Sequence, residues 1–202
     1  MDTGIAIIRA WLECAVAALD ENAAELNELD RQIGDGDHGS NMLRGFRAAL
    51  AAVDDEESAA ENVRNVGMAL VSNVGGASGP LFGTYFLRMA AAWQAESTTE
   101  DVARGCRLGL DAVMARGKAE PGDATMVDAL LPAVESLEAS MAAGLPLTDA
   151  LSAAARAADA GAQATAPMLA RRGRAAQFGE ASIGHLDPGA VSAALLWSVR
   201  NR

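Results

Sequence analysis

The chain has 202 residues and half of them are hydrophobic, which is enough to bury one substantial core. Aromatic residues make up only 4% and alanine is abundant, so small and aliphatic side chains must fill that core, which favours closely packed helices in a single all-α domain over residues 1–202. The formal net charge of −11 argues against a nucleic-acid-binding protein, because phosphate backbones are bound by clustered lysine and arginine.

The first predicted helix covers about residues 3–29, where apolar residues recur at three- and four-residue spacing. It delivers Asp30 to a glycine-containing break, LDRQIGDGDHGSNM at residues 29–42. Asp37 is expected to cap a second helix. The start of that helix, residues 38–41, is suited to a phosphate because free N–H groups and the helix dipole favour anions there.

A capping box of Ser58 and Glu61 opens a third helix that is expected to run to about Asn73. The second glycine-rich break, residues 73–86, lets backbone approach a ligand closely. An apolar fourth helix is then expected to run to about Ala95.

Thr98 is the predicted start of a fifth helix, which stops near Gly117. A third polar break, residues 117–129, precedes a sixth helix. Asp123 is the expected cap of that helix, and Gly144 is its expected end.

A seventh, alanine-rich helix is predicted over about residues 148–170. An irregular fourth break, residues 170–192, contains Asp187 before Pro188, an arrangement that typically starts a helix, here the eighth. The four breaks follow the first, third, fifth and seventh helices. In an up-and-down array they all fall at the same end, so a ligand is expected there.

Three aspartates, Asp30, Asp35 and Asp37, stand close together in the first break. Helix capping and solvated turns explain Asp37 well and Asp30 poorly, so three carboxylates exceed what a cap requires. Carboxylate oxygens suit magnesium better than zinc, and magnesium usually keeps waters and substrate phosphates in its shell. The cluster therefore predicts a magnesium site with a phosphorylated ligand.

Other phosphate and metal loops fail on context or spacing. GDGDHG satisfies GxGxxG, but no predicted strand precedes it, as a dinucleotide fingerprint requires. An EF-hand beginning at Asp35 would have Phe46 in place of glutamate at its twelfth position. A Walker-type loop is excluded because Lys118 is the only lysine and no Ser or Thr follows it.

Charge counting favours two metal ions. Three aspartates and an ATP of about −4 amount to about −7, which two magnesium ions reduce to about −3. Arg171, Arg172 and Arg174 form the only dense basic cluster, and Arg174 is the preferred group for stabilising charge on a transferring phosphoryl group. For Arg171 and Arg172, a solvated loop or a partner-binding surface is an equally good interpretation.

His38 and Met126 each have two interpretations. His38 is either a capping or loop histidine or a phosphate contact; a phosphohistidine is less favoured, because the adjacent carboxylates would repel a phosphoryl donor. Met126 follows the GDAT turn, and it lines either an apolar slot for adenine or simply the core.

Cysteine use and hydropathy indicate a cytoplasmic protein. Cys14 and Cys106 are far apart and neither belongs to a CxxC pair, so free thiols in a reducing compartment are expected. No uncharged apolar run approaches the roughly 18 residues that a membrane-spanning helix needs, so no membrane association is expected.

Four motifs together resemble those of one protein family. They are LDRQIGDGDHGSNM, GGASGPLFGTYF, KAEPGDATMVDAL and RRGRAAQFGEASIGHLDPGAVS, and they occur in the family's order over essentially the whole chain. The family is that of the nucleotide-binding L subunits of bacterial dihydroxyacetone kinases of the phosphotransferase-linked type. The resemblance implies a barrel or bundle of eight amphipathic antiparallel helices with the nucleotide at one end.

The resemblance also implies ligands and roles for individual residues. Asp30, Asp35 and Asp37 would ligate two magnesium ions that bridge the phosphates of ADP or ATP. The implied nucleotide contacts are His38, Gly39, Ser40, Asn41, Ala77, Ser78, Gly117, Met126, Arg174, Asp187, Pro188 and Gly189.

The resemblance implies partner proteins as well. An M subunit would rephosphorylate the retained ADP from phosphoenolpyruvate, and the γ-phosphoryl group would pass to dihydroxyacetone on a K subunit. Three alternatives stay open: free ATP as the donor, another small ketose such as erythrulose as the acceptor, and a regulatory module that binds ADP and docks on a transcription regulator.

Overall fold

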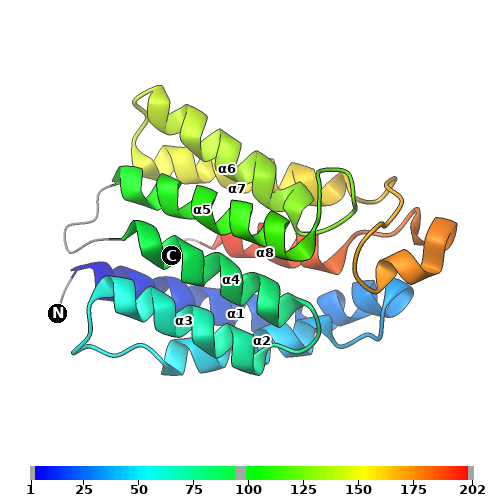
Figure 1. Ribbon diagram of the computed structural model, residues 1–202, viewed down its shortest axis with the longest axis horizontal. Helices are drawn as coiled ribbons and strands as arrows, with labels where there is room; N and C mark the ends of the chain where they lie inside the picture. Colours follow the sequence, from blue (N-terminus) through cyan, green and yellow to red (C-terminus); the bar gives the residue numbers. More distant parts are fainter. Residues whose placement is uncertain (1–2, 94–98, 200–202) are drawn as a thin grey trace.

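The computed structural model describes residues 3–93 and 99–199. Over these ranges the chain forms eight α-helices and two 3₁₀ helices and contains no strand, which confirms the predicted all-α class (Figure 1). The helices are α1 (Thr3–Ile33), α2 (His38–Ala51), α3 (Ala59–Asn73), α4 (Ser78–Met89), η1 (Ala90–Ala92), α5 (Thr99–Gly117), α6 (Val127–Ala142), α7 (Leu147–Gln163), η2 (Ala175–Ser182) and α8 (Pro188–Ser198).

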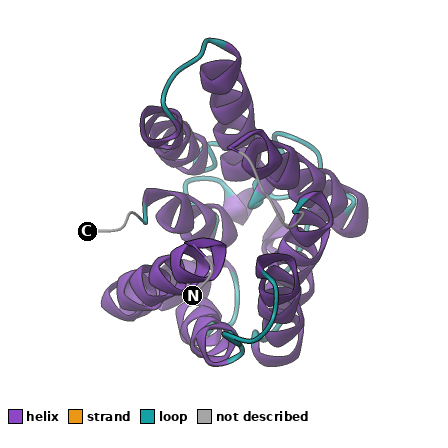
Figure 2. Cartoon of the chain, turned by 90° about the vertical axis from the view of Figure 1, so that its left-hand side faces the viewer, coloured by secondary structure: helices purple, strands orange, loops and turns teal. Residues whose placement is uncertain are grey.

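The α-helices close into a ring. Each one packs against the next along the chain, and α8 returns to pack against α1, as the view along the bundle shows (Figure 2). The last helix is apolar on nearly every side because it contacts α1, α6 and α7 at once. None of the described helices is long and apolar enough to cross a membrane.

Small and aliphatic side chains fill the core, as the composition predicts. The apolar series of α1, for example, is buried at each turn from Ile5 through Leu12 and Leu19 to Leu26. Burial of each such side chain stabilises the fold by roughly 1.5–3 kcal/mol relative to exposure. One aromatic cluster, centred on Phe46, joins α1, α2 and α4.

Three helix ends differ from the prediction. The first helix continues to Ile33, one turn beyond residue 29, so Asp30 lies within a helix rather than in the loop. The fourth α-helix ends at Met89 and gives way to η1, whereas its predicted end at Ala95 and the predicted cap Thr98 lie outside the described residues. The seventh ends at Gln163, because the approaching Pro167 cannot continue a helix.

The capping predictions are confirmed at α3 and α8 and are wrong at α6 and at α2, whose start is described with the site. Ser58 and Glu61 form the expected capping box, and Asp187 accepts a hydrogen bond from the Ala190 N–H at 2.7 Å at the start of α8. Asp123 does not cap α6, which begins four residues later at Val127. Its carboxylate instead accepts the Glu120 N–H within the preceding loop, because that loop folds back on itself.

The four predicted breaks lie at one end of the bundle, as expected. They are the segments 34–37, 74–77, 118–126 and 164–187, which gather at the right-hand end of the molecule in Figure 1. The shared loop end predicted from helix order alone is therefore confirmed, and ligand binding there stays a prediction.

Candidate functional site

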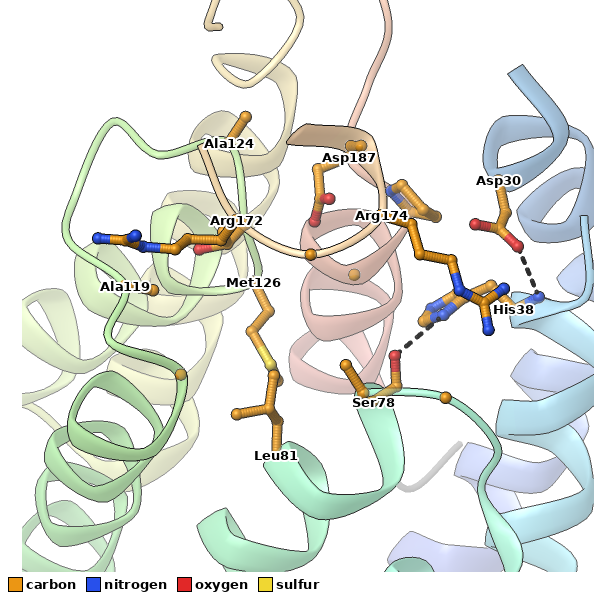
Figure 3. A pocket seen from close by; sticks show the side chains of 18 of the residues that line it. Asp30, His38, Ser78, Leu81, Ala119, Ala124, Met126, Arg172, Arg174 and Asp187 are labelled. Carbon is orange, nitrogen blue, oxygen red and sulfur yellow. Dashed lines mark hydrogen bonds between the residues drawn. The ribbon is translucent and has the colours of Figure 1, made fainter. Parts of the chain in front are cut away.

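A pocket of about 340 Å³ opens where the four loops meet, a volume that suits a nucleotide-sized ligand. Figure 3 shows that its two halves differ: Asp30, His38 and Arg174 lie on one side, and Leu81 and Met126 on the other. The predicted site residues that line this pocket are Asp30, Asp35, Asp37, His38, Asn41, Ala77, Ser78, Gly117, Met126, Arg174, Asp187, Pro188 and Gly189.

Two predicted nucleotide contacts do not line the pocket. Gly39 is buried against α1, where a Cβ would overlap the carbonyl of Ala23. Ser40 is exposed and exchanges two hydrogen bonds with the side chain of Asn27, at 2.8 and 3.0 Å. Both residues join α2 to α1 in this structure, and their phosphate contacts stay predictions.

The three aspartates form a compact cluster at the polar end. One carboxylate oxygen from each of Asp30, Asp35 and Asp37 lies within 4.8 Å of the other two, with Asp30 buried and the other two exposed. Oxygen atoms alone make up this ligand set, and such sets suit magnesium rather than zinc. The residues present therefore fit a magnesium ion.

Asp30 also holds the loop between α1 and α2, a role that the sequence alone does not predict. Its Oδ2 accepts the backbone N–H groups of Gly36, Asp37 and His38 at 2.9, 2.9 and 3.2 Å, which leaves Oδ1 for a cation. The prediction that Asp37 caps α2 is therefore wrong: Asp37 occupies the N-cap position, but its side chain forms no cap bond. Gly34 is required beside Asp30, since a Cβ there would overlap the carboxylate.

Arg174 pairs with Asp35 across the mouth of the pocket. The two side chains are about half exposed, at 50% and 47%, so solvent screens their attraction. The arginine lies on the segment before η2, and Figure 3 shows its guanidinium group near His38 and Asp30. One side chain of the predicted basic cluster thus reaches the aspartate cluster.

The other two arginines bind the loops together. The buried carboxylate of Asp123 lies 3.3 Å from Arg172 Nε and 3.8 Å from Arg171 Nη1, and the Arg171 N–H donates to the Asp123 carbonyl at 3.0 Å. These contacts attach the segment 164–187 to the loop 118–126. The sequence indicates a solvated loop or a partner-binding surface for the two arginines, and it does not predict this contact between loops.

His38 is buried between two helices. Its Nε2 lies 2.9 Å from Ser192 Oγ of α8, and its Nδ1 lies 3.3 Å from Ser78 Oγ of α4. Burial lowers the pKa of His38 to about 4, although the carboxylates of Asp30 and Asp37 act in the opposite direction. At neutral pH the imidazole is uncharged, which argues against a cationic phosphate clamp.

At the start of α4, residues that line the pocket have backbone N–H groups without a side-chain cap. Ala77 at the N-cap position provides no side-chain cap, and Gly76 before it turns the chain with a φ of +64°. The first N–H groups of a helix have no partner within the helix and attract anions. By contrast, at the start of α2 the His38 N–H is bonded to Asp30 and the Ser40 N–H is bonded to Asn27. Phosphate binding at a helix start is therefore better supported at Ser78 than at residues 38–41.

The apolar half is a slot between α4, α5 and the loop before α6. Leu81, Val113 and Ala119 line it together with Met126, which is only 5% exposed. Met126 belongs to the core cluster and also lines the pocket, and its contact with adenine stays a prediction. An apolar slot of this kind suits a planar base.

Asp187 lines the pocket at the start of α8. Burial of the carboxyl group, together with the repulsion of Asp128 and Asp30, raises its pKa to about 7, although the Ala190 N–H acts in the opposite direction. The carboxyl group that accepts the cap hydrogen bond from Ala190 is therefore only partly ionised at neutral pH.

Sequence reasoning missed several residues of this site. Ser192 lies 154 positions from its partner His38, and nothing in its helical surroundings marks it. Leu81 and Val113 belong to ordinary apolar series, so only the folded chain shows that they line a pocket. Gly34 stands next to the predicted ligand Asp35 in the sequence, although its packing role beside Asp30 needs the structure.

Comparison with known proteins gives a consistent result. The chain matches the DAK2 domain over residues 32–199. It is 49% identical over 187 residues to the PEP-dependent dihydroxyacetone kinase, ADP-binding subunit DhaL, of Escherichia coli, a match that covers 90% of this chain and 89% of the relative.

Another relative and a solved structure agree with this match. The PTS-dependent dihydroxyacetone kinase, ADP-binding subunit DhaL, of Lactococcus lactis is 40% identical over 93% of this chain and 91% of its own length. The dihydroxyacetone kinase from C. freundii, solved in complex with AMP-PNP and Mg²⁺, matches 96% of this chain with 33% of its own at 29% identity and a TM-score of 0.74.

Proposed function

Because the chain belongs to the DAK2 domain family, among the ADP-binding subunits of PEP- and PTS-dependent dihydroxyacetone kinases, we propose that it holds ADP with two magnesium ions in this pocket. The ADP is a retained cofactor that receives a phosphoryl group in place and passes it to dihydroxyacetone. The chain is thus one subunit of a phosphotransferase that works only with its partners.

One observation carries the proposal, namely the division of a single pocket into an apolar slot and an acidic end. The slot at Leu81 and Met126 accommodates adenine, and the acidic end at Asp30, Asp35 and Asp37 accommodates metal-bound phosphates. The unoccupied N–H groups at the start of α4 lie between them and supply donors for the phosphate oxygens.

The chain's own groups position the phosphates and balance their charge. Bound magnesium supplies electrostatic stabilisation of the charge on the phosphate oxygens. Asp30 offers Oδ1 to a metal while Oδ2 fixes the loop, so the ligand is held rigidly. Arg174 is the chain's cation at the aspartate cluster, and it stabilises negative charge on the transferring group.

The pocket supports an acceptor that is activated elsewhere. The three clustered carboxylates are assigned to metal, Asp187 caps α8 through the Ala190 N–H, and both ring nitrogens of His38 face protein hydroxyls. None of these groups is assigned to deprotonating a sugar hydroxyl. We therefore assign dihydroxyacetone to a K subunit and the rephosphorylation of ADP to an M subunit. The mouth at Arg174, where the phosphates would end, is the place where both partners must approach.

The test is a phosphoryl-transfer assay with added K and M subunits. We expect dihydroxyacetone phosphate from phosphoenolpyruvate in the complete system, and denaturation of the purified protein should release ADP. Free ATP without an M subunit is the control for an ATP-dependent kinase, and erythrulose is the control for another acceptor. Retained ADP without any transfer from either donor would refute the kinase and favour a regulatory ADP-binding module.

A further inference from the structure

The imidazole of His38 connects two helices that are distant in the sequence. Its Nε2 meets Ser192 Oγ on α8 at 2.9 Å, and its Nδ1 meets Ser78 Oγ at the start of α4 at 3.3 Å, as Figure 3 shows for the second contact. Ser192 is fully buried, and His38 is 7% exposed. Both ring nitrogens are therefore engaged by protein groups and not by solvent.

The hydrogen bonds around Ser192 determine which nitrogen carries the proton. The Ser192 hydroxyl donates its single proton to the carbonyl of Gly189 at 3.0 Å, so toward His38 it must accept. Nε2 is therefore protonated on the α8 side, and Nδ1 faces Ser78.

We infer that Ser192 is a positioning residue that holds the His38 ring in one orientation, with Nδ1 directed at the Ser78 hydroxyl. His38 then positions Ser78 at the polar end of the pocket and makes no phosphate contact of its own. The phosphate part of this inference rests on the proposed function. The hydrogen-bond chain from Ser192 through His38 to Ser78 does not.

The first test is ¹⁵N NMR of the two histidines in the nucleotide-free protein. We expect His38 to be protonated at Nε2 in the wild type, and Ser192→Ala to change its ring ¹⁵N shifts because the acceptor is lost. Ser198→Ala is the matched control: Ser198 lies on the same helix and donates to the Leu195 carbonyl at 2.7 Å, the same local bond without a side-chain partner. A His38 ring protonated only at Nδ1 would overturn the inference.

The second test compares ligands with and without phosphates. Ser192→Ala should weaken ADP binding about 3- to 10-fold, the usual effect of losing one neutral hydrogen bond, and leave adenosine binding within about 2-fold. In a Ser78→Ala background the effect of Ser192→Ala should fall below about 2-fold, because the chain is already broken.

The outcomes separate the inference from the proposed function. Equal losses for ADP and adenosine, or an undiminished effect in the Ser78→Ala background, would show that Ser192 has only a structural role. A wild-type protein that binds no ADP would refute the proposed function, and the NMR result would still decide whether Ser192 orients His38.

Discussion

Replacing Asp30 by alanine tests the claim that this side chain stabilises the fold as well as binding metal. The variant removes the acceptor of three N–H groups, of which the His38 N–H is buried and the Gly36 and Asp37 N–H groups are reached by water. Losing a buried bond to a charged group costs about 1.5–3 kcal/mol, and the other two bonds add about 0.5 kcal/mol each. Relief of repulsion among the clustered carboxylates offsets about 1 kcal/mol.

The expected net loss of unfolding free energy is about 1.5–3 kcal/mol for the metal-free, nucleotide-free protein. With a slope of about 2 kcal/mol per molar urea, the unfolding midpoint falls by about 1 M. Asp35→Ala is the control, because Asp35 is half exposed and pairs only with exposed Arg174, so its effect stays within about 0.5 kcal/mol. Urea unfolding in EDTA measures both. Equal midpoints for the two variants would refute the assignment, whereas ADP retention should be lost in both.

Three further predictions concern other parts of the molecule. Asp187→Asn should stabilise the nucleotide-free protein at pH 8 and not at pH 3. The folded pKa of Asp187, about 7, exceeds the ordinary 3.8, so the native state loses stability as the pH rises between these values. An unchanged thermal unfolding temperature of the variant at pH 8 would contradict this prediction. Gly39→Ala should cost about 1–3 kcal/mol even without nucleotide, since the new Cβ meets the Ala23 carbonyl; a variant as stable as the wild type, but poorer in ADP binding, would indicate a ligand contact instead. Burial raises the pKa of Cys106 to about 11, so at pH 8 a thiol reagent should modify no more than one cysteine, Cys14, in the native protein and both after denaturation.

Much of the architecture follows from local sequence patterns. Apolar spacing and the Ser58–Glu61 capping box depend on neighbours within a few residues, so the helices and the shared end of their loops could be predicted without a structure. The clustering of Asp30, Asp35 and Asp37 was equally visible, because all three lie within eight residues.

The remaining features depend on contacts between distant segments. Asp30 took over the capping expected of Asp37 because α1 continues for another turn and brings the carboxylate over the start of α2. Asp123 accepts a hydrogen bond within its own loop and lies beside arginines some fifty residues later, and Ser192 meets His38 only because the ring of helices closes. No local pattern encodes such pairings, because each partner has an ordinary local role.

The assembly of one pocket from four loops has a consequence for cooperativity. Each loop connects the two helices of a different hairpin, so no hairpin by itself contains a complete binding site. A bound nucleotide therefore stabilises only the conformation in which all hairpins are docked, and partial openings that separate any two of them release it. Amide hydrogen exchange should then slow in helices on every side of the ring when nucleotide binds. For the slowest-exchanging amides, the free energy of the opening that permits exchange should increase by the full binding free energy.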